Sequence, residues 1–125
     1  MKKAVFTDKA PKAIGPYSQA IWSGDFLYCS GQVGVDAVTG DVVEGGLKAQ
    51  TEQALQNIKA VLDSQGLTFA NVIKSLVFLT DMANFGDFNE VYGKVFDSDP
   101  PARSCVAAAG LPKGALVEIE VIARK

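Results

Sequence analysis

Residues 116–123 read Leu-Val-Glu-Ile-Glu-Val-Ile-Ala, and the alternation in this stretch is the strongest structural signal of the chain. Every second residue belongs to one apolar set, which comprises Val117, Ile119, Val121 and Ala123. Because side chains alternate across a β-strand, this set is predicted to pack against helices. Glu118 and Glu120 then lie on the opposite face. Two carboxylates there need either lysine or amide partners at a subunit contact, or a chemical role.

The remaining sequence predicts the elements around this strand. Apolar positions at helical spacing indicate a helix over Leu47–Gln65, which Gly66 ends. A second helix is predicted between Asn84, as its cap, and Asp99-Pro100-Pro101. Its inward stripe consists of Phe85, Phe88, Tyr92, Val95 and Phe96. Strands are predicted over residues 17–22, 26–30, 72–80, 104–108 and 115–123, whereas the polar first dozen residues are expected to be loosely held.

This order of elements predicts a single α+β domain over residues 1–125. Two amphipathic helices can cover only one face of one mixed sheet, which gives a two-layer sandwich. The other face carries Leu76, Phe78 and Leu116, so it is too apolar to face water. We therefore expect another copy of the chain to cover it, which predicts a homo-oligomer.

Composition excludes several classes of function. Lys and Arg total 12 and Asp and Glu total 14, so the net charge of −2 argues against general nucleic-acid binding. The chain has no histidine, which removes Ser-His-Asp and Cys-His nucleophiles and His-ligated zinc. Neither a metal-ligand set nor a nucleotide-binding glycine loop is present, so no metal and no cofactor are expected. Without a signal peptide or an apolar membrane span, a cytoplasmic protein is predicted, with Cys29 and Cys105 reduced.

Arg103 is the leading candidate for ligand binding. It follows the rigid segment Pro100-Pro101-Ala102 and opens a strand of small residues. A guanidinium held in this way suits a two-point hydrogen bond to a carboxylate, although a solvated surface arginine is the alternative. Cys105 shares its strand parity. With no histidine to activate the thiol, Cys105 is better read as a small packed residue whose backbone groups matter.

Three further polar residues are weaker candidates. Tyr17 is placed either over a small ligand or half-buried in the core. The Ser30 hydroxyl either orients a polar substrate atom or bonds within a turn. Asn89 either contacts a ligand from the second helix or lies on the helix surface.

The chain resembles the RidA/YjgF family of reactive imine and enamine deaminases over nearly its whole length. The segments that carry the resemblance are Ala13–Gln19, Ser30-Gly31-Gln32, Gln50-Thr51 with Asn57, Pro101–Val106, Leu111-Pro112-Lys113 and Val117–Glu120. One departure lies in the loop Ser98-Asp99-Pro100-Pro101, where relatives often carry an aromatic residue and a longer approach. That difference concerns the outer wall of the pocket and so the side-chain preference.

The resemblance implies a chorismate-mutase-like fold and a homotrimer, in which three sheets form a barrel and active sites lie between subunits. It implies hydrolysis of 2-imino acids to 2-keto acids and ammonia, which protects pyridoxal-phosphate enzymes from 2-aminoacrylate. The implied roles are carboxylate binding for Arg103, water activation for Glu118, backbone contacts to the imine for Cys105, closure over the substrate for Tyr17, and pocket lining for Ser30, Gly31 and Asn89.

Two other functions compete with this one. A RidA-like protein can keep the fold and bind a small metabolite without turnover, but the presence of both Arg103 and Glu118 favours the enzyme. The family's names also include a ribonuclease or translation inhibitor, which the charge and the missing histidine argue against. The partners expected are therefore a small imino acid and further copies of the chain, with no nucleic acid and no membrane.

Overall fold

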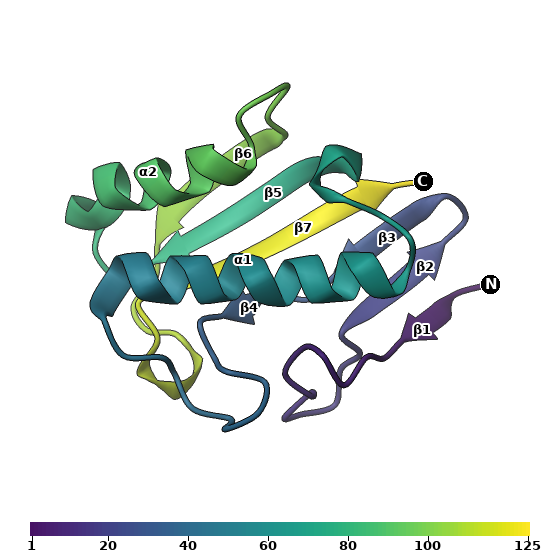
Figure 1. Ribbon diagram of the computed structural model, residues 1–125, viewed down its shortest axis with the longest axis horizontal. Helices are drawn as coiled ribbons and strands as arrows, with labels where there is room; N and C mark the ends of the chain where they lie inside the picture. Colours follow the sequence, from purple (N-terminus) through teal and green to yellow (C-terminus); the bar gives the residue numbers. More distant parts are fainter.

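A seven-stranded mixed sheet forms one layer of the molecule, and two α-helices form the other (Figure 1). The computed structural model describes residues 1–125. The strands are β1 (Lys3–Val5), β2 (Ala20–Ser23), β3 (Phe26–Cys29), β4 (Gln32–Val33), β5 (Val72–Leu79), β6 (Ala102–Ala107) and β7 (Val117–Arg124). The helices are α1 (Gly46–Ser64) and α2 (Phe85–Val95), with short 3-10 turns at Phe69–Asn71, Met82–Asn84 and Pro112–Gly114.

The sheet runs in the order β1-β2-β3-β7-β5-β6, and the short β4 also pairs with β7. All pairings are antiparallel except that of β5 with β6, which is parallel. The chain from β5 to β6 passes through α2, as a parallel connection requires. β6 lies at one edge of the sheet, and it is the strand that follows α2 in the sequence.

The alternation of β7 has the predicted consequence. Val117, Ile119, Val121 and Ala123 are each at most 1% exposed and belong to the core that both helices cover. From α1, the core receives Ile58 and other apolar residues at helical spacing. The predicted two-layer α+β sandwich with two helices on one face is confirmed.

Two local predictions are wrong. The N-terminal segment is not loose, because Lys3–Val5 forms β1 on β2 and the buried Gln19 side chain bonds the next turn. Asn84 occupies the N-cap position of α2 but its side chain makes no capping hydrogen bond. The Asp81 side chain instead accepts from Ala83 N and caps the preceding 3-10 turn. The first prediction failed because the Gln19 side chain holds the N-terminal segment through hydrogen bonds to residues distant in sequence. The second failed because a 3-10 turn precedes α2 and has its own cap.

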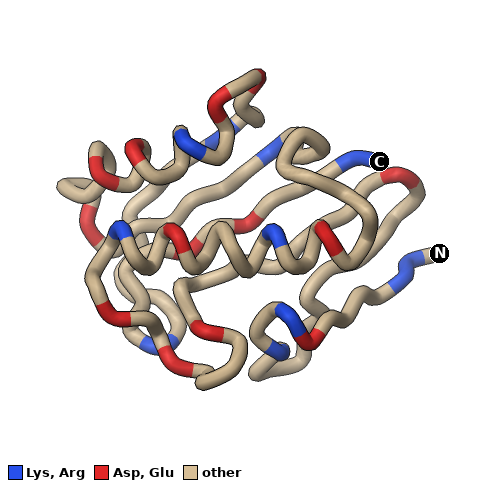
Figure 2. Tube along the Cα trace, viewed as in Figure 1, with Lys and Arg blue, Asp and Glu red and all other residues tan.

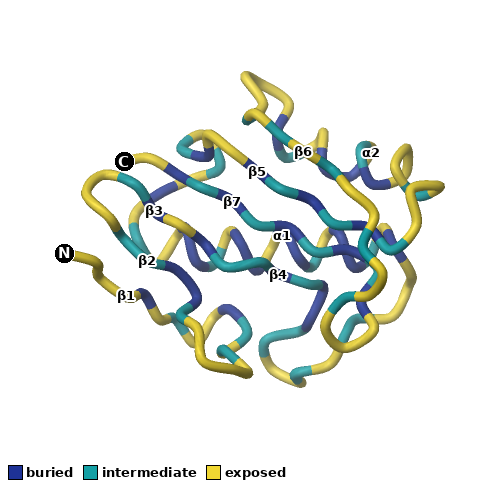
Figure 3. Tube along the Cα trace, turned by 180° about the vertical axis from the view of Figure 1, so that it is seen from behind, coloured by how far each residue is buried: buried dark blue, intermediate teal, exposed yellow.

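The opposite face of the sheet carries no helix (Figure 3). The pairing register places Leu76, Phe78 and Val106 on this face beside Glu118 and Glu120. Val106 and Tyr28 are 45% and 48% exposed, and Leu76, Phe78 and Leu116 are only half-buried. In a single chain this face is therefore a largely apolar surface with two carboxylates in it. None of the helices is both long and apolar enough to span a membrane.

Candidate active site

A groove of about 960 Å³ opens beside the uncovered end of β7. Its walls come from the N-terminal segment, the loop after β4 and the turn at Pro112-Lys113. Four of the residues predicted for the site line it together: Tyr17, Ser30, Gly31 and Glu118. Residues from three separate stretches of sequence, one of which contains Glu118, thus line one groove.

Glu118 lies on β7 between Val33 of β4 and Phe78 of β5. Its carboxylate forms no ion pair in the chain, since the two ion pairs are Lys48–Glu90 and Lys59–Asp63. Burial raises the pKa of the Glu118 carboxyl above its ordinary value, and the neighbouring negative charge of Glu120 raises it further. A half-buried, unpaired carboxylate with a raised pKa is a stronger base than an ordinary carboxylate and is suited to accept and return a proton.

The absence of a side chain at Gly31 leaves room for the Glu118 carboxylate. A Cβ at position 31 would overlap Oε2 of Glu118 and would lie 2.8 Å from its carboxyl carbon. The backbone before β4 therefore runs directly along the acid, and the glycine is required by the close approach. The structure thus identifies Glu118 as the group that the backbone approaches at Gly31.

Tyr17 and Ser30 occupy the groove differently. Tyr17 is 49% exposed, and its hydroxyl accepts a hydrogen bond from Ile14 N at 3.3 Å. Its ring is therefore on the surface of the groove rather than in the core. The Ser30 hydroxyl donates to the Ser18 carbonyl at 2.6 Å, twelve residues earlier in the chain, and therefore does not bond within a turn. Its oxygen can still accept a hydrogen bond from a ligand.

Two groove residues were given no role by the sequence analysis. The buried Gln19 side chain accepts from Thr7 N at 2.7 Å and donates to the carbonyls of Thr7 and Pro11, which fixes one wall. Lys113 donates to the Gly40 carbonyl at 2.5 Å and joins two loops at the rim. Both residues stand in segments that carry the family resemblance, and that was the only signal available for them.

Arg103 lies elsewhere, on the edge strand β6 beneath α2. Its Cζ is 4.8 Å from the ring centroid of Tyr92, 5.6 Å from that of Phe88 and 5.5 Å from that of Phe85. No carboxylate of the chain pairs with it. The guanidinium is thus supported by aromatic rings while its charge has no partner.

Asn89 and Cys105 belong to the same region as Arg103. Asn89 follows Phe85 by four residues on α2 and is half-buried. Cys105 shares the face of Arg103 on β6, as predicted. Burial raises the pKa of the Cys105 thiol, and the Arg103 charge opposes that rise only in part, so the thiol is protonated at neutral pH. Burial also raises the pKa of Cys29, to about 12, so neither cysteine is a reactive thiolate.

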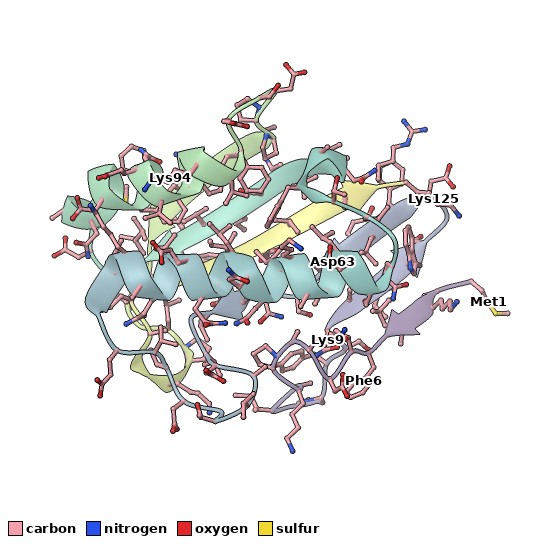
Figure 4. All side chains as sticks on the ribbon, in the orientation of Figure 1. Met1, Phe6, Lys9, Asp63, Lys94 and Lys125 are labelled. Atoms are coloured by element: carbon pink, nitrogen blue, oxygen red, sulfur yellow. The ribbon has the colours of Figure 1, made fainter.

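The predicted residues therefore form two groups on opposite faces of one sheet. Arg103 pairs in register with Ser75 and Cys105 with Val77, on the helix face, whereas Glu118 pairs with Phe78 on the open face. The segments that carry the two groups also lie on different sides of α1. The N-terminal segment with Phe6 and Lys9 lies on one side of α1, and α2 with Lys94 lies on the other (Figure 4). Arg103 and Glu118 of one chain consequently do not share one pocket.

Charge on the molecule is dispersed. Basic and acidic residues alternate over α1, the loops and the strand ends, and no continuous basic stripe runs across the trace (Figure 2). No group of three His, Cys, Asp or Glu side chains is arranged to hold a metal ion. The groups that remain available for chemistry are the carboxylate, the guanidinium, hydroxyls and backbone.

The chain is similar to known proteins along nearly its whole length. The family model Endoribonuclease L-PSP matches residues 7–125. A RutC family protein of Pyrococcus horikoshii is 50% identical over 125 residues, which cover 100% of this chain and 99% of that protein. A Mus musculus protein named 2-iminobutanoate/2-iminopropanoate deaminase is 46% identical over 123 residues, 98% of this chain and 91% of that protein.

Solved structures agree with the sequence relatives. The crystal structure of E. coli TdcF with bound serine superposes with a TM-score of 0.93 at 40% identity and covers 98% of both chains. The chain belongs to the RidA/YjgF/L-PSP family, and its α+β fold is the chorismate-mutase-like fold of that family.

Proposed function

We propose that this protein hydrolyses reactive 2-imino acids and their enamine forms, 2-aminoacrylate/2-iminopropanoate and 2-iminobutanoate, to 2-keto acids and ammonia. By removing these compounds it would protect pyridoxal-phosphate enzymes. The observation that carries the proposal is the pair of unsatisfied charges, Arg103 on the helix face and Glu118 on the open face. The deaminase name of the mouse relative and the serine in the TdcF structure support it.

Assembly would complete the site. Arg103 is on the edge strand β6, and Glu118 is in a groove on the other face of the sheet. A head-to-tail contact between identical chains brings two different surfaces together and forms a ring when the rotation between neighbours closes. In a homotrimer of this kind, Arg103 of one subunit would reach the Glu118 groove of the next. The apolar open face, with Phe78 and Val106, would become the interior of the assembly.

Each group then has a defined task. The Arg103 guanidinium would bind the substrate carboxylate through two parallel hydrogen bonds. The Glu118 carboxylate would accept a proton from a water molecule as the water oxygen bonds to C2 of the protonated imine. It would return that proton to the amino nitrogen of the resulting carbinolamine. The C–N bond would then break as the carbinolamine hydroxyl gives its proton to the Glu118 carboxylate, which leaves a 2-keto acid and ammonia. The ammonia would take up that proton and leave as ammonium, so that Glu118 is ionised again. Backbone groups at Cys105 and Gly31 would orient the nitrogen, with Tyr17 over the substrate and Ser30 and Asn89 lining the pocket.

Modest catalysis is sufficient for this reaction. A protonated imine carbon is already a strong electrophile, so one positioned base that contributes ~10²–10⁴-fold is of the right order. Holding the substrate carboxylate adds orientation. The chemistry therefore requires only groups that this chain contains.

The decisive experiment generates imines in place with an amino-acid oxidase or a threonine dehydratase and follows their decay with the purified protein. We expect Arg103→Ala and Glu118→Gln to return the decay rate to the uncatalysed value while the assembly persists. Arg124→Ala is the matched control, because Arg124 is the only other arginine and lies at the chain end over the Phe26 ring. Full activity in Arg103→Ala would contradict the proposal.

Two outcomes would support other functions. Binding of a keto or amino acid without ammonia release would indicate a metabolite-binding protein. RNA cleavage that survives Arg103→Ala and weakens with salt would support the activity that the family model's description names. The net charge of −2 and the missing histidine make the second outcome the less expected one.

A further inference from the structure

We propose that Tyr92, held by Ser75, is a positioning residue that orients the Arg103 guanidinium toward a ligand carboxylate. This inference rests on the proposed function, because it concerns the group assigned to carboxylate binding. It assigns a task to an aromatic stripe that the sequence analysis interpreted only as core.

The geometry is a cluster of three rings around one cation. Tyr92, Phe88 and Phe85 all come from the inward stripe of α2, and all three ring centroids lie within 6 Å of the Arg103 Cζ. Tyr92 is the nearest at 4.8 Å. A guanidinium over an aromatic face is attracted by the negative face of the ring, and the attraction grows as water is excluded. Phe88 is fully buried and Tyr92 is 6% exposed, so this surface is rigid and mostly dry.

Support by rings has a chemical advantage over support by a carboxylate. An acidic partner would occupy the N–H groups of the guanidinium and neutralise its charge. An aromatic ring attracts the guanidinium without accepting from its N–H groups as a carboxylate would. Arg103 is therefore held in place while it keeps the donors that a bidentate carboxylate contact requires.

Ser75 fixes the Tyr92 ring, which is the nearest of the three to Arg103. Its hydroxyl and the Tyr92 hydroxyl are 2.9 Å apart, and Ser75 is fully buried on β5, directly opposite Arg103 in the sheet register. A buried hydroxyl without a hydrogen-bond partner is costly, and in this pair each hydroxyl is the partner of the other. The bond joins the Tyr92 ring on α2 to β5, the strand that pairs with β6. It therefore fixes the position of the ring relative to Arg103.

The first arm of the test uses NMR and needs no activity. The chain has only two arginines, so labelled arginine gives two side-chain signals, which Arg124→Lys assigns. Arg124 lies 5.6 Å from a single ring, that of Phe26, and is the internal reference. We expect a larger upfield ring-current shift for the Arg103 side chain than for Arg124. That excess should be largely lost in Tyr92→Leu and kept in Tyr92→Phe.

The second arm measures kinetics with imines. Tyr92→Leu should raise KM roughly five- to tenfold and leave kcat within about twofold, because carboxylate binding is lost equally from substrate and transition state. Tyr92→Phe should recover most of this loss, with KM about two- to threefold above the wild type, because the ring is retained whereas the bond that fixes it to Ser75 is lost. Phe69→Leu is the matched control: its ring belongs to the same cluster through Phe96 but does not contact Arg103. It should lower the melting temperature without changing KM.

The outcomes separate this inference from the proposed function. If the wild type does not hydrolyse imines, titration with 2-oxobutanoate on the Arg103 signal replaces KM, and weaker binding in Tyr92→Leu still supports the positioning role. No excess shift for Arg103, or equal effects of Tyr92→Leu and Phe69→Leu on KM or on 2-oxobutanoate binding, would overturn it. Should Tyr92→Leu not fold, Phe85→Leu removes another of the three rings at a position that is 38% exposed.

Discussion

Gly31 lies against the carboxylate of Glu118 so closely that a methyl group at position 31 would overlap Oε2. We therefore expect Gly31→Ala to displace the acid and to reduce kcat/KM for imine hydrolysis by about 10²-fold, since small misplacements of a catalytic group have effects of that size. The melting temperature should change little, because the obstructing atoms are the end of a flexible side chain.

A matched glycine provides the control for this change. A Cβ at Gly110 would meet nothing within 4 Å, so Gly110→Ala should retain activity. Equal activity in Gly31→Ala and Gly110→Ala would show that the contact with Glu118 does not matter for turnover.

Gly34 predicts a different phenotype from Gly31. A Cβ there would lie 2.6 Å from the Gln50 backbone in α1, and backbone atoms cannot move aside as a carboxylate can. Gly34→Ala should lower the free energy of unfolding by about 1–3 kcal/mol, the usual cost of overpacking. Urea denaturation measures this change. A loss no larger than that of Gly110→Ala would contradict the tight contact between α1 and the backbone at Gly34, which follows β4.

The pH dependence of turnover should report Glu118. Because the base must be ionised, kcat/KM should fall as pH drops through the raised pKa of Glu118, at a higher pH than for an ordinary carboxyl. Glu120→Gln removes the like charge that contributes to that rise, so its acid limb should move to lower pH. An acid limb that Glu120→Gln leaves in place would argue against this coupling.

The same raised pKa has a consequence for stability. Folding favours the protonated Glu118, so its contribution to stability is full below the ordinary carboxyl pKa and is lost as pH rises through the folded-state pKa. Glu118→Gln should remove this decline and be at least as stable as the wild type at neutral pH. Thermal unfolding of both proteins across this pH range measures the effect, and a less stable variant at neutral pH would contradict it.

The open face of the sheet should control assembly. Val106 is 45% exposed on this face, and a carboxylate there would have to be buried without a partner when copies associate. Val106→Glu should therefore yield folded monomers without imine hydrolysis, as measured by native mass spectrometry and circular dichroism. Gln56→Glu adds the same charge on exposed α1 and should leave assembly intact. Assembly that survives Val106→Glu would place the interface elsewhere.

Local periodicity accounts for the parts of the fold that the sequence predicted. The alternation of β7 and the helical spacing of α1 each bury one face, so their type and orientation follow from the side chains alone. β1 could not be recognised in this way, because three residues carry too little pattern. Its position depends on pairing with β2 and on the bonds of Gln19 to the segment that follows.

The candidate residues were proposed one by one from the sequence, and only the resemblance implied that they meet between subunits. Which face receives Arg103 follows from the parallel pairing of β6 with β5, a long-range feature that spacing does not contain. The stripe of α2 reads as core from its apolarity, and only the topology brings Tyr92 over Arg103. The split between the Arg103 and Glu118 faces has the same origin.

The most direct test mixes two inactive proteins. If each site takes Arg103 from one subunit and Glu118 from the next, hybrids of Arg103→Ala and Glu118→Gln contain some sites in which both residues are intact. In a cyclic trimer that contains both variants, one of the three sites combines an intact Arg103 with an intact Glu118, so hybrids should regain about one third of the wild-type activity. Co-expression with two different tags, followed by double affinity purification, isolates such hybrids for the imine-decay assay. Recovery of activity near that level is the predicted result, whereas hybrids no more active than the two parent variants would contradict a site shared between subunits.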